Sequence, residues 1–317
     1  MTKYDVISMG SAVVDAFVYP HFKEINNKIQ LVVGEKIRLE NINFTVGGGG
    51  TNSATCLSKL GFKVGLLTKL GLGYNAKIIL RELEKNKIDF LGKQGKEHTG
   101  YSIILGTDKG NRTILTFKGT SDDLKFSEIM LKKLNTKWFY FTSMGGESFK
   151  SQKKIVAFAR KKGIKIGYNP SSFHTSRGPE YLKEKFNHTD FLSLNKEEAG
   201  MLAKNGNVFK WLHKLGPKIV CITDGPNKGY VYDGSFLYTY TPNKIKVVDP
   251  TGAGDAFGSS FVAGLHRFGD VEDAIKVALA NSESLIQKPG AHNGLLNWNE
   301  IMNVLKRKRF KIEKKMI

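Results

Sequence analysis

VVDPTGAGDAFGSSF, residues 247–261, joins backbone-bending residues directly to an apolar, helix-forming run. Gly252 and Gly254 allow successive backbone N–H groups to point the same way, and a helix beginning near Ala253 adds its unpaired donors and its dipole. Such a loop stabilises an anion, whether a carboxylate or a phosphate. Asp255 therefore has two interpretations: it is a charge that stabilises a helix N-terminus, or it accepts a proton from a hydroxyl that attacks a phosphoryl group.

A second glycine-rich segment, TVGGGGTNSA (45–54), lies between a predicted strand and a predicted helix. Its four glycines allow another group to approach the backbone closely, and Asn52 offers both a donor and an acceptor. A tight turn alone would also explain the glycines. By itself the segment is therefore a weak indication of a binding site, and it becomes informative only together with the other motifs.

Two further strand ends carry polar residues. In SLNKEEAG (193–200), Asn195 and Glu198 lie three residues apart at a strand end and helix start, which suits a Mg²⁺–water site or a helix-capping pair. ITDGPNKG (222–229) is a strand followed by a turn that can receive a nucleotide.

Short β-rich runs alternate with helical patterns along most of the chain, which indicates βαβ units and a mostly parallel sheet. Two segments, 28–47 and 100–119, each predict strand, turn and strand with no helix after them. We expect these segments to form a small β-sheet lid over one end of the main sheet. The prediction is a single domain, residues 1–317, with lid segments inserted at about 13–45 and 99–119.

The 317 residues carry a net charge of +20, and 41 of the 49 basic residues are lysine. The densest cluster, LKRKRFKIEKK (305–315), is interpreted as a solvated helix end, and aromatic residues do not interleave with it as in a stacking surface. A basic nucleic-acid-binding protein stays a remote alternative. No signal peptide or membrane span is apparent, and Cys56 and Cys221 match no metal-binding spacing, so we expect a cytoplasmic protein.

LLTKLGLGYNAKIILREL (66–83) contains G-x-G-x-x-A between a strand and a helix, close to a dinucleotide-binding fingerprint. Asp89 follows at a distance that suits a ribose contact. The unit does not include the first strand, however, and it leaves the other three motifs unexplained. A nicotinamide-dependent oxidoreductase is therefore a minor alternative.

Together the motifs resemble the ribokinase-like (phosphofructokinase B type) carbohydrate kinases, a family of sugar, sugar-phosphate and nucleoside kinases. The resemblance runs from GSAVVD (10–15) to KPGAHNG (288–294). DPTGAGDAF matches the family's C-terminal signature, with Ser260 where Ala or Gly is usual. The N-terminal signature is matched by Gly47, Gly48, Gly50, Asn52, Ala54, Gly61 and Gly71. The resemblance implies a three-layer α/β/α fold with a mostly parallel central sheet of about nine strands and a small β-sheet lid.

The resemblance also implies a role for each matching residue. Asp255 is the catalytic base, and Gly252, Ala253 and Gly254 form the anion hole. Glu198 holds Mg²⁺ through water, and Asp249, with the loop around Gly290, marks a monovalent-cation site (K⁺) of some members. Residues assigned to the substrate are Asp15, Gly48, Asn52 and, if the substrate carries a phosphate, Arg112 with Lys118. Those assigned to the nucleotide, ATP or ADP, are Asn195, Thr223, Gly225 and Asn281.

The substrate itself stays open between a sugar, a phosphosugar and a nucleoside. Gly73 and Ala76 stand where many members have aspartate and glycine, which weakens assignment to the best-known ribokinases and fructokinases. Phe17, Tyr19 and Tyr101 on the lid strands suit stacking on a base or packing against a sugar. For Arg112 and Lys118, solvated positions on the lid are the simpler interpretation. A homodimer formed through the lid is also expected.

Overall fold

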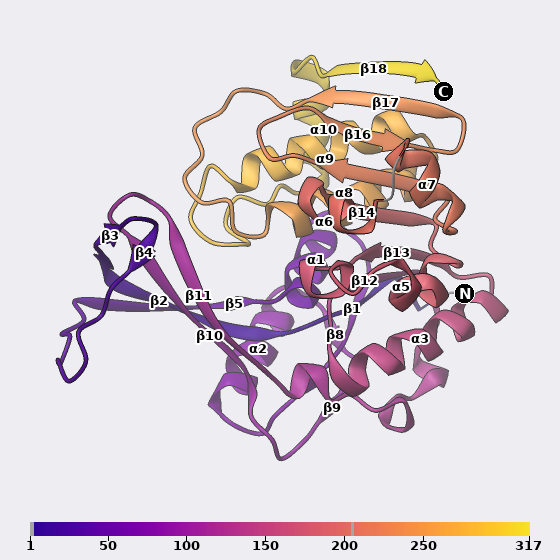
Figure 1. Ribbon diagram of the computed structural model, residues 1–317. Helices are drawn as coiled ribbons and strands as arrows, with labels where there is room; N and C mark the ends of the chain where they lie inside the picture. Colours follow the sequence, from indigo (N-terminus) through magenta and orange to yellow (C-terminus); the bar gives the residue numbers. More distant parts are fainter. Residues whose placement is uncertain (1–2, 204–205) are drawn as a thin grey trace.

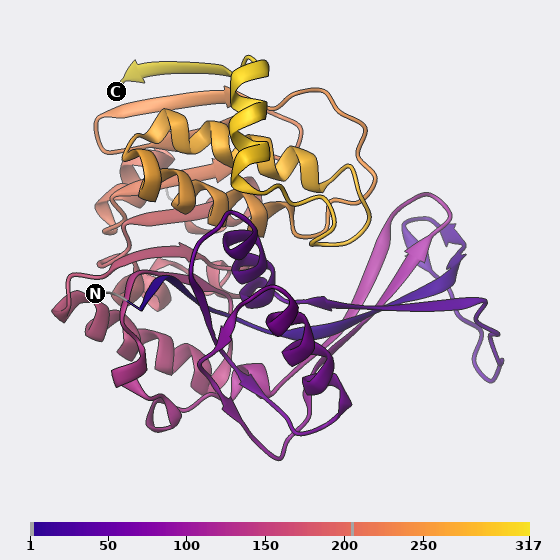
Figure 2. The ribbon, with the colours of Figure 1, turned by 180° about the vertical axis from the view of Figure 1, so that it is seen from behind.

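The computed structural model describes residues 3–203 and 206–317. Within these ranges the chain forms a ten-stranded sheet with helices on both faces and a separate four-stranded sheet that projects from one side (Figures 1 and 2). The expected three-layer α/β/α architecture with a small β lid is therefore confirmed.

The main sheet is parallel over most of its width and antiparallel at one edge. Its strand order is β18-β17-β16-β15-β14-β13-β12-β1-β6-β8. The parallel strands are β1 (Tyr4–Met9), β6 (Val64–Leu67), β8 (Asp89–Phe90), β12 (Thr136–Thr142), β13 (Lys165–Asn169), β14 (Phe191–Asn195) and β15 (Ile219–Thr223). The antiparallel ones are β16 (Gly229–Tyr232), β17 (Phe236–Thr241) and β18 (Lys311–Met316). Because both faces are covered, the central strands are apolar almost throughout.

Each face of the sheet packs against its own group of helices (Figures 1 and 2). One face carries α1 (Gly49–Lys59), α2 (Tyr74–Lys85), α8 (Ala253–Phe268), α9 (Val271–Leu285) and α10 (Trp298–Arg307). The other carries α3 (Gly146–Lys161), α5 (Pro179–Phe186), α6 (Lys196–Leu202) and α7 (Val208–Lys214). Among the described residues, no helix is both long enough and apolar enough to cross a bilayer.

Short elements complete the described chain. They are the helix α4 (Ser172–Thr175), the 3₁₀ turns η1 (Thr120–Asp122), η2 (Phe126–Glu128) and η3 (Leu131–Lys133), and the two-residue strands β3 (Glu24–Ile25), β4 (Lys28–Ile29), β7 (Lys69–Leu70) and β9 (Lys93–Gln94). The G-x-G-x-x-A segment follows β7 rather than the first strand. A Cβ at Gly71 would lie 2.2 Å from the carbonyl oxygen of Glu97, so packing within the chain accounts for this glycine.

The lid consists of β2 (Val13–Phe22), β5 (Asn41–Gly47), β10 (Thr99–Thr107) and β11 (Arg112–Gly119), in the order β11-β10-β2-β5. The predicted hairpin at 100–119 forms as β10 and β11. The predicted hairpin at 28–47 was wrong: β5 pairs with β2, and β4 is only two residues long. The long alternating strand β2 offers β5 seven partners, from Val13 opposite Gly47 to Tyr19 opposite Asn41.

The basic tail differs from its prediction as a solvated helix end. Helix α10 stops at Arg307, and Lys311–Met316 pair with β17 as the edge strand β18. Alternation explains the result, because Ile312 packs on the hydrophobic core while neighbouring lysines face outward. Lysines on an edge strand also discourage pairing with another chain.

Candidate active site

The four-glycine run allows helix α1 to start against the end of β1. A Cβ on Gly50 would lie 2.6 Å from the backbone of Gly10, and one on Gly48 would lie 2.5 Å from the carbonyl oxygen of Ser11. Gly48 also has a φ of +97°, a conformation that favours glycine. Close backbone packing therefore accounts for the run, and it places Asn52 in the first turn of α1, facing α8.

Helix α8 begins as the DPTGAGD segment predicted. Gly252 precedes it with a φ of +77°, and the amide of Ala253 donates to the carbonyl of Pro250. Among the described residues, the amides of Gly254 and Asp255 have no backbone or side-chain acceptor. A Cβ built on Gly254 would meet nothing within 4 Å. The helix N-terminus therefore presents free donors and open space, which is the requirement for an anion site.

The Asp255 carboxylate lies in this first turn and contacts α1. Oδ2 of Asp255 accepts a hydrogen bond from Nδ2 of Asn52 at 2.9 Å. Burial raises the pKa of Asp255, and the bond from Asn52 and the positive charge of Lys118 act against that rise. The group combines the desolvation that makes a carboxylate more basic with contacts that keep it charged.

A cavity of about 500 Å³ opens between Asp255 and the lid. Of the residues singled out from the sequence, Asp255, Glu198 and Lys118 line it. The remaining lining is mostly polar and was missed: Ser11, Gly49, Thr116, Asp122, Thr142, Ser143, Met144, Gly145, Asn169, Ser171 and Phe173. Gly49 belongs to the four-glycine segment, whereas the other residues carry no motif of their own. Only those at or just after the carboxyl ends of β12 and β13, from Thr142 to Gly145 and from Asn169 to Phe173, could have been suggested by their places on strands.

Asp15 and Lys118 form the polar part of the lid beside this cavity. Burial raises the pKa of Asp15, while a hydrogen bond from Ser102 and the charges of Lys118 and Arg112 lower it. A Cβ on Gly47 would collide with the Asp15 carboxylate, which explains that glycine. Lys118 is thus close enough for its positive charge to lower the pKa of both Asp15 and Asp255. The aromatic ring of Tyr101, by contrast, packs on the main core.

Arg112 does not line the Asp255 cavity, contrary to the role expected for it. Its Nη1 lies 2.9 Å from Oδ1 of Asp249 and 2.5 Å from Oγ1 of Thr251, so it links the lid tip to the loop before α8. It borders a different cavity of about 550 Å³, between the lid tip and Pro250. Lys118 is the lid cation that faces Asp255.

The same contacts bear on the monovalent cation expected at Asp249. Its Oδ1 also accepts from the backbone and side chain of Thr251, and its Oδ2 accepts from the amide of Gly290. Burial alone would raise the pKa of Asp249, but these bonds and Arg112 lower it. The guanidinium already supplies a positive charge there. The residues present therefore do not fit a K⁺ ion on this carboxylate.

Asn195 and Glu198 form a reciprocal capping box at the start of α6. Oδ1 of Asn195 accepts from the amide of Glu198 at 2.8 Å, and Oε2 of Glu198 accepts from the amide of Asn195 at 3.0 Å. The capping interpretation is therefore correct, but Glu198 also lines the cavity. Burial raises the pKa of Glu198 to about 7. Neighbouring Thr223 lies opposite Asn195 at the end of β15, followed by Gly225 with a φ of +54°.

Asn281 does not fit the nucleotide contact expected of it. It is fully buried in α9. Its Nδ2 donates to Oγ of Ser260 and contacts Sγ of Cys56, and its Oδ1 accepts from the amide of Leu296. The side chain joins α1, α8 and the loop before α10. This contact also explains the polar Ser260 at a position where the resemblance leads one to expect Ala or Gly.

Replacing Asn281 with alanine should lower stability without weakening nucleotide binding. The change leaves the Leu296 amide without its acceptor, at about 1–3 kcal/mol for an unsatisfied group, and removes one partner of the Ser260 hydroxyl, which keeps its contact with Sγ of Cys56. Denaturant unfolding measures the loss, and the KM for ATP measures nucleotide binding. If the KM for ATP rose tenfold in a stably folded variant, Asn281 would have to contribute to nucleotide binding.

Comparison with known proteins identifies the family of the chain. The family model described as pfkB family carbohydrate kinase matches residues 6–298. A cytidine kinase of Thermococcus kodakarensis is 26% identical over 90% of this chain and 97% of its own length. The Arabidopsis thaliana ribokinase complexed with ribose and ATP aligns with a TM-score of 0.82 and 20% identity, over 97% of this chain and 100% of that one.

A candidate ribokinase II from E. coli in complex with ATP and Mg²⁺ aligns with a TM-score of 0.81 and 18% identity, over 96% of this chain and 99% of that one. These structures show a shared fold, and the family model covers nearly the whole chain. The chain belongs to the pfkB family of carbohydrate kinases, enzymes that transfer a phosphoryl group to a hydroxyl of a sugar or sugar-like substrate.

Proposed function

We propose that this kinase phosphorylates a small sugar or sugar-like substrate bound between the lid and Asp255, with ATP as the phosphoryl donor. The observation that carries the proposal is the Asp255 carboxylate beside the free amides of Gly254 and Asp255, in the lining of a cavity to which Ser, Thr and Asn side chains also contribute. Hydroxyl-rich substrates need many polar partners, and the Ser, Thr and Asn side chains of this cavity supply them.

In the proposed reaction, Asp255 accepts the proton of the acceptor hydroxyl as that oxygen bonds to the γ-phosphorus. The bond between this phosphorus and the β,γ-bridging oxygen breaks, and ADP leaves with the electron pair. The amides of Gly254 and Asp255 stabilise the negative charge on the transferring group. Asn52 keeps the carboxylate oriented, and Asp15 accepts hydrogen bonds from other hydroxyls of the substrate.

The nucleotide is proposed to lie along the ends of β14 and β15. Thr223 follows Asn195 in register across these strands. The positive φ of Gly225, with open space around it, suits a turn against which a ligand can rest. The helix α8 N-terminus lies at the phosphate end of this path.

Mg²⁺ is the metal proposed for this site, with Glu198 binding it through water. Among the described residues there is no cluster of three or more His, Cys, Asp or Glu side chains that would hold a metal alone. This fits an ion bound mainly by nucleotide phosphates and water, as Mg²⁺ prefers. When bound, the ion neutralises charge on the phosphates. Glu198 supplies a cavity-facing oxygen whose ionisation the ion would favour.

Replacing Glu198 with glutamine should raise the Mg²⁺ concentration that gives half-maximal rate. Because the pKa of Glu198 is about 7, acidification from pH 8 to 6 protonates it and removes its charge. The wild-type Mg²⁺ requirement should therefore rise as pH falls, and the glutamine variant should lack this rise. Glutamine preserves the capping acceptor, so folding is retained.

Glu197→Gln is the matched control, since Glu197 is an exposed acid in the same helical turn. It should leave the Mg²⁺ requirement at the wild-type value at each pH. Equal Mg²⁺ requirements for wild type and Glu198→Gln would reduce Glu198 to a capping residue.

A nucleoside is the second candidate substrate. Phe17 and Tyr19 alternate with Asp15 along β2, so they share its face of the lid and suit stacking on a base. A screen of ATP consumption over sugars, phosphosugars and nucleosides decides between the classes. The proposal requires turnover with a sugar or phosphosugar, whereas activity confined to nucleosides selects the alternative.

We also propose that a second copy of the chain covers the lid to form a homodimer in the cytoplasm. On one face of the lid, the outer strands β5 and β11 expose Phe44, Leu115 and Phe117. Such an apolar surface is typical of an interaction site. Cys56 and Cys221 are free thiols, as expected in a reducing compartment. Sedimentation that finds only monomers would contradict the dimer.

A further inference from the structure

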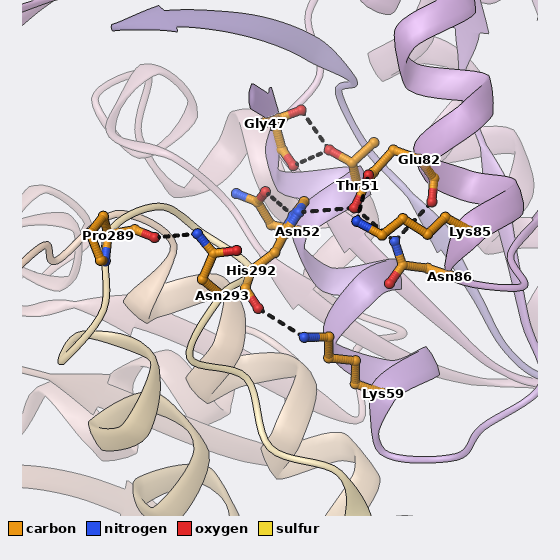
Figure 3. A network of polar contacts seen from close by, with 11 residues as sticks. Gly47, Thr51, Asn52, Lys59, Glu82, Lys85, Asn86, Pro289, His292 and Asn293 are labelled. Atoms are coloured by element: carbon orange, nitrogen blue, oxygen red, sulfur yellow. Dashed lines mark hydrogen bonds and ion pairs between the residues drawn. The ribbon is translucent and has the colours of Figure 1, made fainter. Parts of the chain in front are cut away.

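A third residue extends the contact between Asp255 and Asn52. Nε2 of His292 lies 3.0 Å from Oδ1 of Asn52 (Figure 3). Nδ2 of the same Asn52 donates to Asp255. His292 comes from the loop between α9 and α10, and Asn52 comes from α1. Three distant segments therefore meet in one line of hydrogen bonds that ends on the base.

The donors and acceptors in this line are fixed by the charge at its end. An ionised carboxylate only accepts, so the amide nitrogen of Asn52 must face Asp255. Its amide oxygen then faces His292 and needs a donor, which Nε2–H supplies. If the Asn52 amide turned over, its oxygen would face the Asp255 carboxylate and repel it. A donor at the position of Nε2 prevents this.

The His292 side chain is mostly buried, and its backbone is hydrogen-bonded to α1. The side chain is 14% exposed, and Nζ of Lys59 donates to its backbone carbonyl at 3.1 Å (Figure 3). Oε1 of Glu82 lies 4.0 Å from Nδ1, too far for a hydrogen bond, and Lys85 lies beyond it. Burial lowers the pKa of His292 to about 4, with Glu82 acting against that effect and Lys59 and Lys85 adding to it. The ring is therefore neutral at neutral pH.

We propose that His292 is a positioning residue for phosphoryl transfer: its Nε2–H holds the Asn52 amide so that Nδ2 stays on Asp255 and keeps the base ionised and aimed. The inference rests on the proposed role of Asp255 as the base. Asp255 also faces the positive charge of Lys118 on β11, and the negative charges of Asp255 and Glu198 of α6 repel each other over a longer distance. Neither of these replaces the geometric constraint that Asn52 provides.

The test compares His292→Gln with His292→Asn. A glutamine amide nitrogen reaches the position of Nε2, whereas the asparagine amide is one carbon shorter and does not. We expect His292→Asn to lower kcat about tenfold with little change in the KM for ATP, and His292→Gln to stay within about threefold of wild type. Thermal unfolding confirms that both variants are folded. Equal kcat values for the two variants would overturn the proposal.

A second measurement separates this inference from the assignment of the base. If His292 acts through Asp255, His292→Asn should cause no further loss in an Asp255→Asn background. A further tenfold loss in that background would show that His292 acts elsewhere, while the base assignment stood. If Asp255→Asn alone kept wild-type turnover, the base assignment itself would fail.

Discussion

Replacing Asp255 with asparagine should lower kcat by roughly 10²–10⁴-fold, because removing a general base costs about that much. Asparagine has nearly the same shape and still accepts a hydrogen bond from Asn52, so the fold and the KM for ATP should change little. Steady-state kinetics on the best substrate measures the effect. If Asp255 were only a helix charge, the change would cost about 0.3–1 kcal/mol of stability and leave turnover intact.

Asp273→Asn provides the matched control for this variant. Asp273 lies in the first turn of α9 and forms an ion pair with Lys276, outside the cavity. Its replacement removes a helix-terminal charge without touching the site. A loss in kcat of similar size in both variants would show that the Asp255 effect is structural.

Replacing Lys118 with methionine should distinguish phosphorylated from neutral substrates. Lys118 lines the cavity near Asp15 and Asp255, so it is the lid cation placed to bind a substrate phosphate. A charge-assisted hydrogen bond contributes about 1.5–3 kcal/mol, which corresponds to a roughly 10–150-fold loss in kcat/KM for a phosphosugar. For a neutral sugar or a nucleoside, the loss should be a few-fold.

Arg112→Met is the control for this experiment, since Arg112 also belongs to β11 but binds Asp249 and Thr251. Its replacement should affect both substrate classes equally, through the lid and the loop before α8. If Lys118→Met also lowered kcat/KM equally for phosphosugars and for neutral substrates, a phosphosugar would no longer be a proposed substrate.

The sequence does not distinguish the two lid cations, Arg112 and Lys118. Arg112 and Lys118 lie on the same face of one strand, so alternation treats them alike. Six residues along a strand span roughly 20 Å, however, and only the placement of the lid on the main sheet determines which cation reaches the cavity. That placement depends on β2 pairing with β5 and β10, contacts made between distant segments.

Asp255 was predictable because its environment is local. The backbone conformation of Gly252, the free amides and the start of α8 all lie within a few residues of it. Asn281 was not, since its position in α9 is compatible with either a ligand or an internal contact until Cys56, Ser260 and Leu296 are placed around it.

The sequence analysis assigned a role only to Gly290 in the loop that contains His292. His292 was not predictable because its contact with Asn52 spans 240 residues of sequence. The polar cavity residues were missed for the same reason, because strand ends carry no signature until a sheet brings them together. Motifs set by local backbone chemistry can thus be read from the sequence, whereas partners supplied by tertiary packing cannot.

We propose that Asp255 is the base in the transfer of a phosphoryl group from ATP to a hydroxyl of a sugar-like substrate. Incubation with ATP labelled at the γ-phosphorus, followed by separation of the products, tests this role. We expect the wild-type protein with a sugar or phosphosugar to yield labelled substrate and unlabelled ADP, and Asp255→Asn to yield at most about a hundredth of that label. Label that stays in ATP with every sugar, phosphosugar and nucleoside, or equal labelling by the folded variant, would contradict it.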